Sequence, residues 1–150
     1  MRSQQHRRGR ALPSRIRSRG DEARSRSMDD RIRRALSRGH RIDITTTGRR
    51  SGRPRRIEIV FHSIDGRIYV SGTPGFPRSW LANLRTDPQF TFHLKGAVQA
   101  DLPAVARPID DEAERRRVFA EIVKVWTRMD VERMIRSSPL IEVTFPDLAA

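Results

Sequence analysis

The sequence contains no cysteine, which excludes disulfide bonds and thiolate metal sites and fits a reducing, cytoplasmic setting. No apolar run approaches the roughly 20 residues that a membrane-spanning helix needs. The basic N-terminus is not followed by the apolar segment of a secretory signal. A length of 150 residues suits one domain with its own core.

The usual sequence motifs for metals, nucleotides and nucleophilic catalysis are also missing. His6, His40, His62 and His93 are too scattered for metal-ligand spacing, so no metal is expected. The glycine-rich stretch "GRRSGRP" fits neither the P-loop nor the dinucleotide fingerprint, and no nucleophile elbow is present. The sequence therefore identifies no catalytic side chain.

Positive charge is abundant and unevenly distributed. The net charge is +13, but residues 1–56 carry 19 arginines against 5 acidic residues, while residues 57–150 are nearly neutral. Arginine supplies 29 of the 31 basic residues, a bias that a GC-rich genome would also produce. The position of the arginines is therefore more informative than their number.

The first 27 residues contain few apolar side chains and cannot bury enough surface to fold. We expect a disordered basic tail over 1–27, or an upstream start codon ahead of Met28, followed by one cofactor-binding domain over 28–150. Ser27 is a candidate N-cap for a short amphipathic helix that ends at Gly39.

Alternating apolar and polar residues then predict strands, and longer periodicities predict helices. The expected strands cover about 42–47, 56–62, 68–70, 90–94, 97–109 and 140–145, with helices over 78–88 and 110–136. An Asp-Gly turn at 65–66 favours a hairpin. The expected fold is mainly β with helices (α+β), a small antiparallel barrel of about six strands with flanking helices.

The stretch "TTTGRRSGRPRR" (45–56) concentrates arginine on one tight loop. Gly48 and Gly52 permit left-handed turns whose N–H groups converge on an anion, and Arg50 and Arg55 can add forked hydrogen bonds to phosphate or carboxylate. An exposed hairpin tip with solvated charges explains the same residues equally well.

A second stretch, "GTPGFPRSWLAN", runs from a flexible loop into a short helix. Helix N-termini attract anions, and Trp80 and Asn83 share one face, where they can wall and orient a planar ring. The alternative interpretation places Trp80 in the core and Asn83 on a nearby backbone group.

Taken with the hairpin at 64–67 and the strand "FTFHL", these stretches resemble the deazaflavin-dependent nitroreductase and quinone-reductase family over about residues 40–145. The resemblance implies a split β-barrel that binds reduced coenzyme F420, a deazaflavin with a phosphodiester and an oligoglutamate tail. It also implies hydride transfer to a nitro compound, a quinone or another unsaturated acceptor. The implied cofactor contacts are Arg49, Arg50, Ser51 and Arg55 for the phosphate and tail, Glu58, Ile59 and Val60 for the ring, Ser71, Gly72 and Thr73 in the next loop, and Ser79, Trp80 and Asn83 on the short helix.

Three alternatives stay open at this point. Relatives of this barrel bind flavin mononucleotide (FMN) or haem, although the resemblance favours F420. A nucleic-acid-binding module would use the basic tail, but aromatic residues are not interleaved with the arginines. The third alternative is a barrel that binds the cofactor but does not catalyse a reaction. The acceptor and the oligomeric state are open, with a homodimer as one option; where family members place tyrosines near the C-terminus, this chain offers Trp126, Met129 and Met134.

Overall fold

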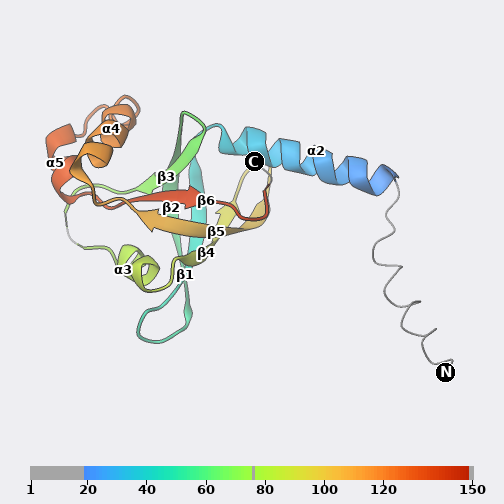
Figure 1. Cartoon of the computed structure of the whole chain (residues 1–150), viewed down its shortest axis with the longest axis horizontal. Coiled ribbons are helices and arrows are strands. Elements are labelled where there is room, and N and C mark those ends of the chain that lie inside the picture. The colour runs from blue at the N-terminus through green and yellow to red at the C-terminus, as the bar shows by residue number, and fades with distance from the viewer. Residues whose placement is uncertain (1–18, 76, 149–150) are drawn as a thin grey trace, which may run out of the picture.

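The computed structural model describes residues 19–75 and 77–148, without the side chains of residues 21–27. Within this range the chain forms four helices and six strands (Figure 1). Their bounds are α2 (Arg19–Leu36), β1 (Arg41–Thr47), β2 (Pro54–Ile64), β3 (Arg67–Ser71), α3 (Ser79–Thr86), β4 (Gln89–Leu94), β5 (Ala100–Pro108), α4 (Glu112–Ile122), α5 (Val131–Ser137) and β6 (Leu140–Thr144).

The six strands close into one antiparallel barrel in the order β1-β2-β3-β6-β5-β4, with β4 paired back to β1. The turn between β2 and β3 is the expected Asp-Gly turn, with positive φ at Asp65 (52°) and Gly66 (78°). The C-terminal strand β6 lies between β3 and β5, far from both in sequence. The antiparallel six-stranded barrel predicted from the sequence is confirmed.

The barrel interior is filled by the apolar side chains that alternate along the strands. Ile42, Ile44, Phe61 and Phe92 are fully buried in one cluster, in which Phe61 and Phe92 meet edge to face at 5.3 Å. Trp80 and Leu84 of α3, and Ile32 and Leu36 of α2, belong to the same cluster. Only the C-terminal part of α2 meets the barrel, and its N-terminal part extends away from it (Figure 1).

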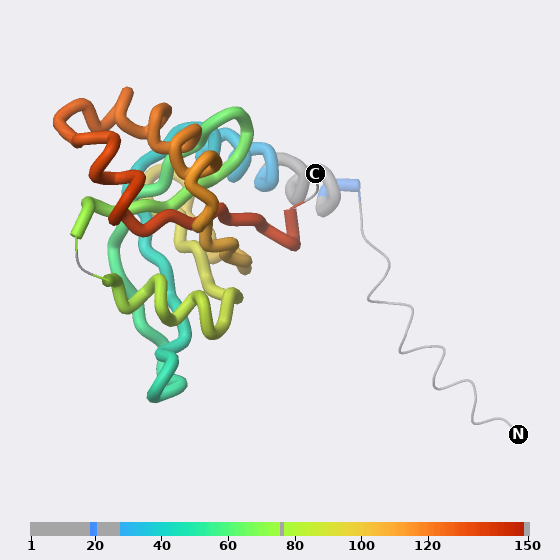
Figure 2. Tube along the Cα trace, turned by 60° about the vertical axis from the view of Figure 1, so that its left-hand side comes forward, coloured from blue at the N-terminus to red at the C-terminus, as the bar shows by residue number. Residues whose placement is uncertain are grey.

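A second apolar cluster joins the barrel to the helical pair α4 and α5. It consists of Tyr69, Ile109, Val118, Phe119, Ile122, Met134, Ile135 and Leu140. In Figures 1 and 2 the two helices lie together at one side of the barrel, away from the β1–β2 loop. This layer buries side chains on the outer surface of the barrel that would otherwise face solvent.

Two helix predictions need correction. The single helix expected over 110–136 is two helices, since a turn-rich segment with β-branched Val123, Val125 and Thr127 interrupts it. Asp130 then starts α5 as an N-cap that accepts hydrogen bonds from the backbone N–H groups of Glu132 and Arg133.

The first helix also begins earlier than predicted. It starts at Arg19, so Ser27 lies within it and is not its N-cap. Arg, Ala and Glu have high helix propensity, which offsets the scarcity of apolar residues in this part. The expected disordered tail therefore does not reach residue 27, and residues 1–18 lie outside the described range.

Strand β2 is paired unequally along its two edges. Residues 54–60 pair with β1 on one side, but β3 pairs on the other side only from Val60 to Ile64. In the described structure, residues 54–59 therefore have a strand neighbour on one edge only. The chain leaves β3 at Ser71, opposite Val60, and turns toward α3.

Candidate functional site

The arginine loop between β1 and β2 has a defined backbone conformation. The Gly48 N–H donates to the Arg53 carbonyl at 2.8 Å, and the Gly52 N–H donates to the Gly48 carbonyl at 2.8 Å. Gly52 has φ of 71°, in the left-handed region that glycine adopts most readily. The Ser51 hydroxyl accepts from the Arg53 N–H at 3.1 Å. The loop is thus a tight turn stabilised by its own backbone, beside α3 (Figure 2).

Asn83 of α3 holds this loop in place. Its Oδ1 accepts hydrogen bonds from the backbone nitrogen and Nη1 of Arg49, each at 3.1 Å, and its Nδ2 donates to the Thr46 hydroxyl at 3.1 Å. Asn83 is only 3% exposed. The alternative interpretation of Asn83 is therefore the observed one, because its amide bonds protein groups and positions the loop.

The arginine loop, strand β2 and helix α3 surround a cavity of about 550 Å³. Its lining comprises Thr46, Gly48, Arg49, Arg50, Ser51, Pro54, Arg55, Arg56, Ile57, Ser79, Trp80 and Asn83. Four of these residues are arginines and none is acidic. Such a volume lies within the range typical of small-molecule sites. The lining gives the cavity a positive potential suited to a multiply charged anion.

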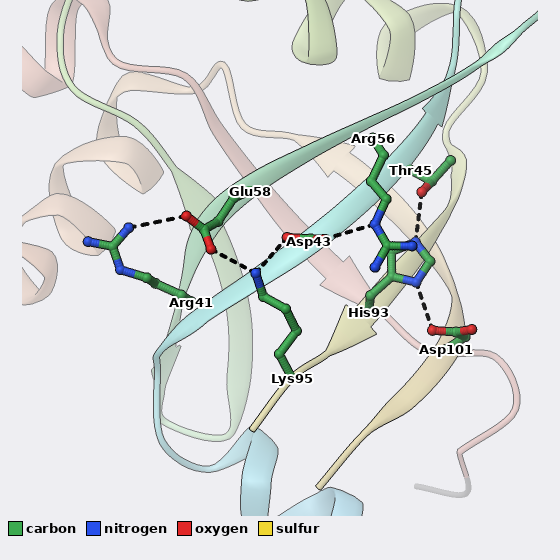
Figure 3. Close-up of polar contacts among 8 residues, drawn as sticks. All are labelled: Arg41, Asp43, Thr45, Arg56, Glu58, His93, Lys95 and Asp101. Atoms are coloured by element: carbon green, nitrogen blue, oxygen red, sulfur yellow. Dashed lines mark hydrogen bonds and ion pairs between the residues drawn. The ribbon is translucent and has the colours of Figure 1, made fainter. Parts of the chain in front are cut away.

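The arginines around this cavity differ from those elsewhere on the barrel. In the described chain, the side chains of Arg50 and Arg55 form neither a hydrogen bond nor an ion pair with the protein. Arg56, by contrast, bonds Asp43 at 2.9 Å, and Arg41 approaches Glu58 at 3.5 Å (Figure 3). Two guanidinium groups thus remain available at the cavity, which favours anion binding over charges arranged at random.

Lys95 connects Asp43 and Glu58, the partners of Arg56 and Arg41, on the outer surface of the barrel (Figure 3). Lys95 lies 2.7 Å from both carboxylates. Its hydrogen bond to Asp43 lowers the pKa of that carboxyl group, and its hydrogen bond to Glu58 does the same there. Both bonds raise the pKa of Lys95, the one to Asp43 contributing more. Glu58 is thus engaged away from the cavity.

The N-terminus of α3 adds to the positive end of the cavity. Arg78 is its N-cap residue but forms no side-chain cap, and the first turn contains no acidic residue. The first N–H groups of this helix are therefore not met by a capping side chain, and such groups bind anions. Ser79 and Trp80, the first two residues of the helix, line the cavity.

Seven of the thirteen predicted cofactor contacts meet at this cavity: Arg49, Arg50, Ser51, Arg55, Ser79, Trp80 and Asn83. Trp80 is 7% exposed and belongs to the barrel core, as the alternative interpretation expects, and it also lines the cavity. Thr46, Arg56 and Ile57 line the cavity too but were not predicted. Thr46 belongs to the alternating pattern that runs into the loop, and this pattern was the sequence signal that could have identified it.

The side chains of Glu58, Ile59 and Val60 do not line the cavity. Ile59 packs against the barrel core, and Val60 faces a different cavity. Glu58 and Ile59 belong to the edge of β2 over residues 54–59 that β3 leaves unpaired, whereas Val60 pairs with Ser71 of β3.

Ser71, Gly72 and Thr73 lie on the other side of the α3 N-cap, outside the cavity lining. The Ser71 hydroxyl donates to the Pro139 carbonyl at 2.7 Å and is buried. Arg78 Nη2 donates to the Thr73 carbonyl at 2.8 Å and to its hydroxyl at 2.9 Å. These groups therefore connect the end of β3 to α3 and to the segment before β6.

One polar chain was not foreseen from the sequence. Thr45 Oγ1 lies 2.7 Å from His93 Nε2, and His93 Nδ1 lies 2.8 Å from Asp101 Oδ1 (Figure 3). An ionised carboxylate accepts only, so Nδ1 carries a proton and a neutral His93 accepts from the threonine hydroxyl. The chain links β1, β4 and β5 on the outer barrel surface, and only the strand register brings its members together.

Comparison with known proteins agrees with this geometry. The family model described as F420H(2)-dependent quinone reductase matches residues 17–144. The chain belongs to this family. It is a family of deazaflavin-dependent oxidoreductases, and the match spans α2, the barrel and β6. The family resemblance drawn from the sequence is thereby confirmed. Within the described residues, no helix is long and apolar enough to cross a membrane.

Solved structures show the same fold at low sequence identity. The F420-H2 dependent reductase FDR-A is 21% identical with a TM-score of 0.52, covering 69% of this chain and 93% of its own. A putative pyridoxamine 5'-phosphate oxidase from Listeria innocua is 18% identical (TM-score 0.57; coverage 80% and 94%). A putative 5-nitroimidazole antibiotic resistance protein from Bacteroides thetaiotaomicron is 14% identical (TM-score 0.59; coverage 79% and 80%).

Proposed function

We propose that this protein uses reduced coenzyme F420 to transfer hydride to a quinone, a nitro compound or another small unsaturated acceptor. The observation that carries the proposal is the cavity of about 550 Å³ lined by four arginines and no acidic residue. A phosphodiester followed by an oligoglutamate tail is the kind of polyanion that such a lining binds. The family name points to quinones, and the name of the Bacteroides relative points to nitro compounds.

The residues present fit the polyanionic part of the coenzyme. Arg50 and Arg55 would pair with phosphate or carboxylate, Arg49 would contribute through a guanidinium already held by Asn83, and Ser79 would offer its backbone N–H. The unpaired edge of β2 over residues 54–59 offers free backbone groups to a planar polar ring.

When bound, the reduced coenzyme supplies a hydride, which together with one solvent proton reduces a quinone to a hydroquinone. The protein residues bind and orient rather than react, which agrees with the lack of an acid–base pair in the cavity lining. Trp80 and Ile57 contribute the apolar part of the wall and exclude water from one side.

The proposal is tested by titrating the purified protein with reduced F420 and following its fluorescence. We expect the affinity to fall as salt rises, because ions screen the arginine–anion attraction. Arg50→Glu is expected to weaken binding at least 100-fold, which corresponds to about 3 kcal/mol. Arg53→Glu is the matched control, since Arg53 belongs to the same loop but does not line the cavity. Equal affinities for the two variants would reject the loop as the cofactor site.

The same measurements separate the alternatives. FMN has one phosphate and no glutamate tail, so a loop built for F420 should bind FMN more weakly and with less salt dependence. A nucleic-acid-binding module would lose affinity when residues 1–27 are removed. F420 binding should survive that truncation, because Ile32 and Leu36, which join α2 to the barrel core, lie beyond it.

A further inference from the structure

His62 is a buried histidine with an unpartnered ring nitrogen. The residue is 5% exposed, and its Nε2 is buried without a hydrogen-bond partner. Burial lowers its pKa to about 4, so the imidazole is neutral at pH 7. A buried polar group without a partner costs about 1–3 kcal/mol, which an apolar residue at this position would avoid.

The surroundings of His62 form a small cavity on the outer surface of the barrel, distinct from the arginine-lined cavity. Its volume is about 350 Å³. Its lining comprises Gly39, Val60, Phe61, His62, Ser63, Ile64, Asp65, Glu121, Ile122, Lys124, Val125 and Trp126. Trp126 meets the His62 ring edge to face, with the ring centres 4.7 Å apart. The wall is thus largely apolar and aromatic, with the imidazole of His62 as part of it and opposite charges at its margin.

We propose that this cavity binds a neutral, planar molecule that carries a carbonyl or hydroxyl oxygen, which forms a hydrogen bond with Nε2 of His62. The aromatic and aliphatic wall favours a flat apolar body, and the neutral imidazole offers no charge to attract an anion. The cavity volume is large enough for a molecule that has one ring or two fused rings.

The position of the cavity connects it to the reaction. Val60 lines it, and Val60 is also the residue at which the unpaired edge of β2 ends. This inference rests on the proposed function: the occupant of this cavity is the electron acceptor. It lies beside the deazaflavin ring, which extends along residues 54–59. His62 then selects acceptors with a hydrogen-bonding oxygen.

The site is tested without the coenzyme, using 1-naphthol as probe and naphthalene as the same shape without an oxygen. We expect added 1-naphthol to move the ¹⁵N resonance of His62 Nε2 in the wild-type protein, and naphthalene to bind at least tenfold more weakly. No movement of the Nε2 resonance, or equal affinity for both probes, would overturn the proposal.

His62→Phe preserves the ring and its contact with Trp126 but removes both nitrogens. We expect the affinity for 1-naphthol to fall about tenfold, the size of one lost hydrogen bond. His40→Phe is the matched control, because His40 also packs edge to face on an aromatic residue, Phe61, at 4.8 Å and does not line this cavity. An affinity of His62→Phe within twofold of that of His40→Phe overturns the proposal, and so does an unchanged affinity in Trp126→Leu.

A second experiment tests whether the molecule bound in this cavity is the electron acceptor. With reduced F420 and 1,4-naphthoquinone, His62→Phe is expected to raise the KM for the quinone about tenfold while leaving the Kd for F420 unchanged. An unchanged KM with intact F420 binding refutes the acceptor assignment alone. If the wild-type protein binds 1-naphthol through His62 but does not bind F420, the proposed function fails while this binding site stands.

Discussion

Asn83 Oδ1 lies 3.1 Å from both the backbone nitrogen and Nη1 of Arg49, so one buried amide on α3 fixes the arginine loop. The guanidinium groups of Arg50 and Arg55, which also line the cavity, form no hydrogen bond or ion pair in the described chain. The geometry of the loop therefore depends on a residue that need not touch the ligand.

Asn83→Leu is expected to weaken F420 binding about tenfold and to lower the free energy of unfolding by about 2 kcal/mol. The reason is that the Arg49 N–H and the Thr46 hydroxyl lose their partner in a buried place. Urea denaturation and cofactor titration measure the two effects. Thr86→Val on the same helix, which removes only a hydroxyl bonded to its own helix, should change neither by a comparable amount. Unchanged cofactor affinity in Asn83→Leu would show that the loop is positioned by other contacts.

The buried His62 makes stability depend on pH. Its folded pKa is about 4, below the unfolded value of 6.5, so the unfolded state binds more protons between these values. This contribution is fully present above pH 6.5 and is lost as pH falls toward 4, to a total of about 3 kcal/mol. Urea denaturation between pH 4 and 7.5 should show that His62→Phe lacks this loss and that His40→Phe retains it. A parallel pH dependence in His62→Phe and wild type would contradict the buried neutral state.

Arg115 joins α4 to α5, to the segment between α5 and β6, and to the residue that follows β5. Its guanidinium donates to four carbonyls, those of Ile109, Met134, Ile135 and Ser138, at 2.6–3.1 Å. Arg115→Met removes all of these bonds and should lower the free energy of unfolding by about 3 kcal/mol. Arg117→Met is the control, since Arg117 is exposed and forms no hydrogen bond in the described structure. Equal thermal denaturation midpoints for the two variants would contradict this role.

Gly39 has no room for a side chain. A Cβ atom there would fall against the Phe61 carbonyl oxygen and 3.1 Å from His62 Cα, both backbone atoms that cannot rotate away. Gly39→Ala is therefore expected to cost about 3 kcal/mol of stability. Gly96→Ala has open space but φ of 98°, so only backbone strain applies, at about 1 kcal/mol. Chemical denaturation of both variants measures the difference, and a smaller cost at Gly39 would refute the close approach.

The sequence predicted those parts of the fold and site that depend on local patterns. Alternation from Ile42 to Thr46 identified β1, and the Asp-Gly turn at Asp65 identified the β2–β3 hairpin. The spacing of Gly48 and Gly52 identified a tight loop, although it could not separate bound anion from solvated charge. The structure adds that Arg50 and Arg55 have no carboxylate partner in the described chain, a fact that depends on the surrounding strands.

Features that depend on strand register or on side-chain packing could not be predicted from the sequence. The alternation of Glu58, Val60 and His62 places them on one face of β2, but it does not show that α4 covers only the His62 end. The break in the long helix depends on Asp130 acting as an N-cap, a role that any Asp in that region could have taken. The link from Asn83 to Arg49 joins residues 34 positions apart and becomes visible only in three dimensions.

The place of β6 between β3 and β5 has a consequence for biosynthesis. While the ribosome is still translating the region before Leu140, the nascent chain can form the sheet β3-β2-β1-β4-β5, but the two edge strands β3 and β5 have no strand between them. Closure must wait until the final strand leaves the exit tunnel. Stalled or prematurely terminated products would therefore present two open sheet margins to chaperones and proteases.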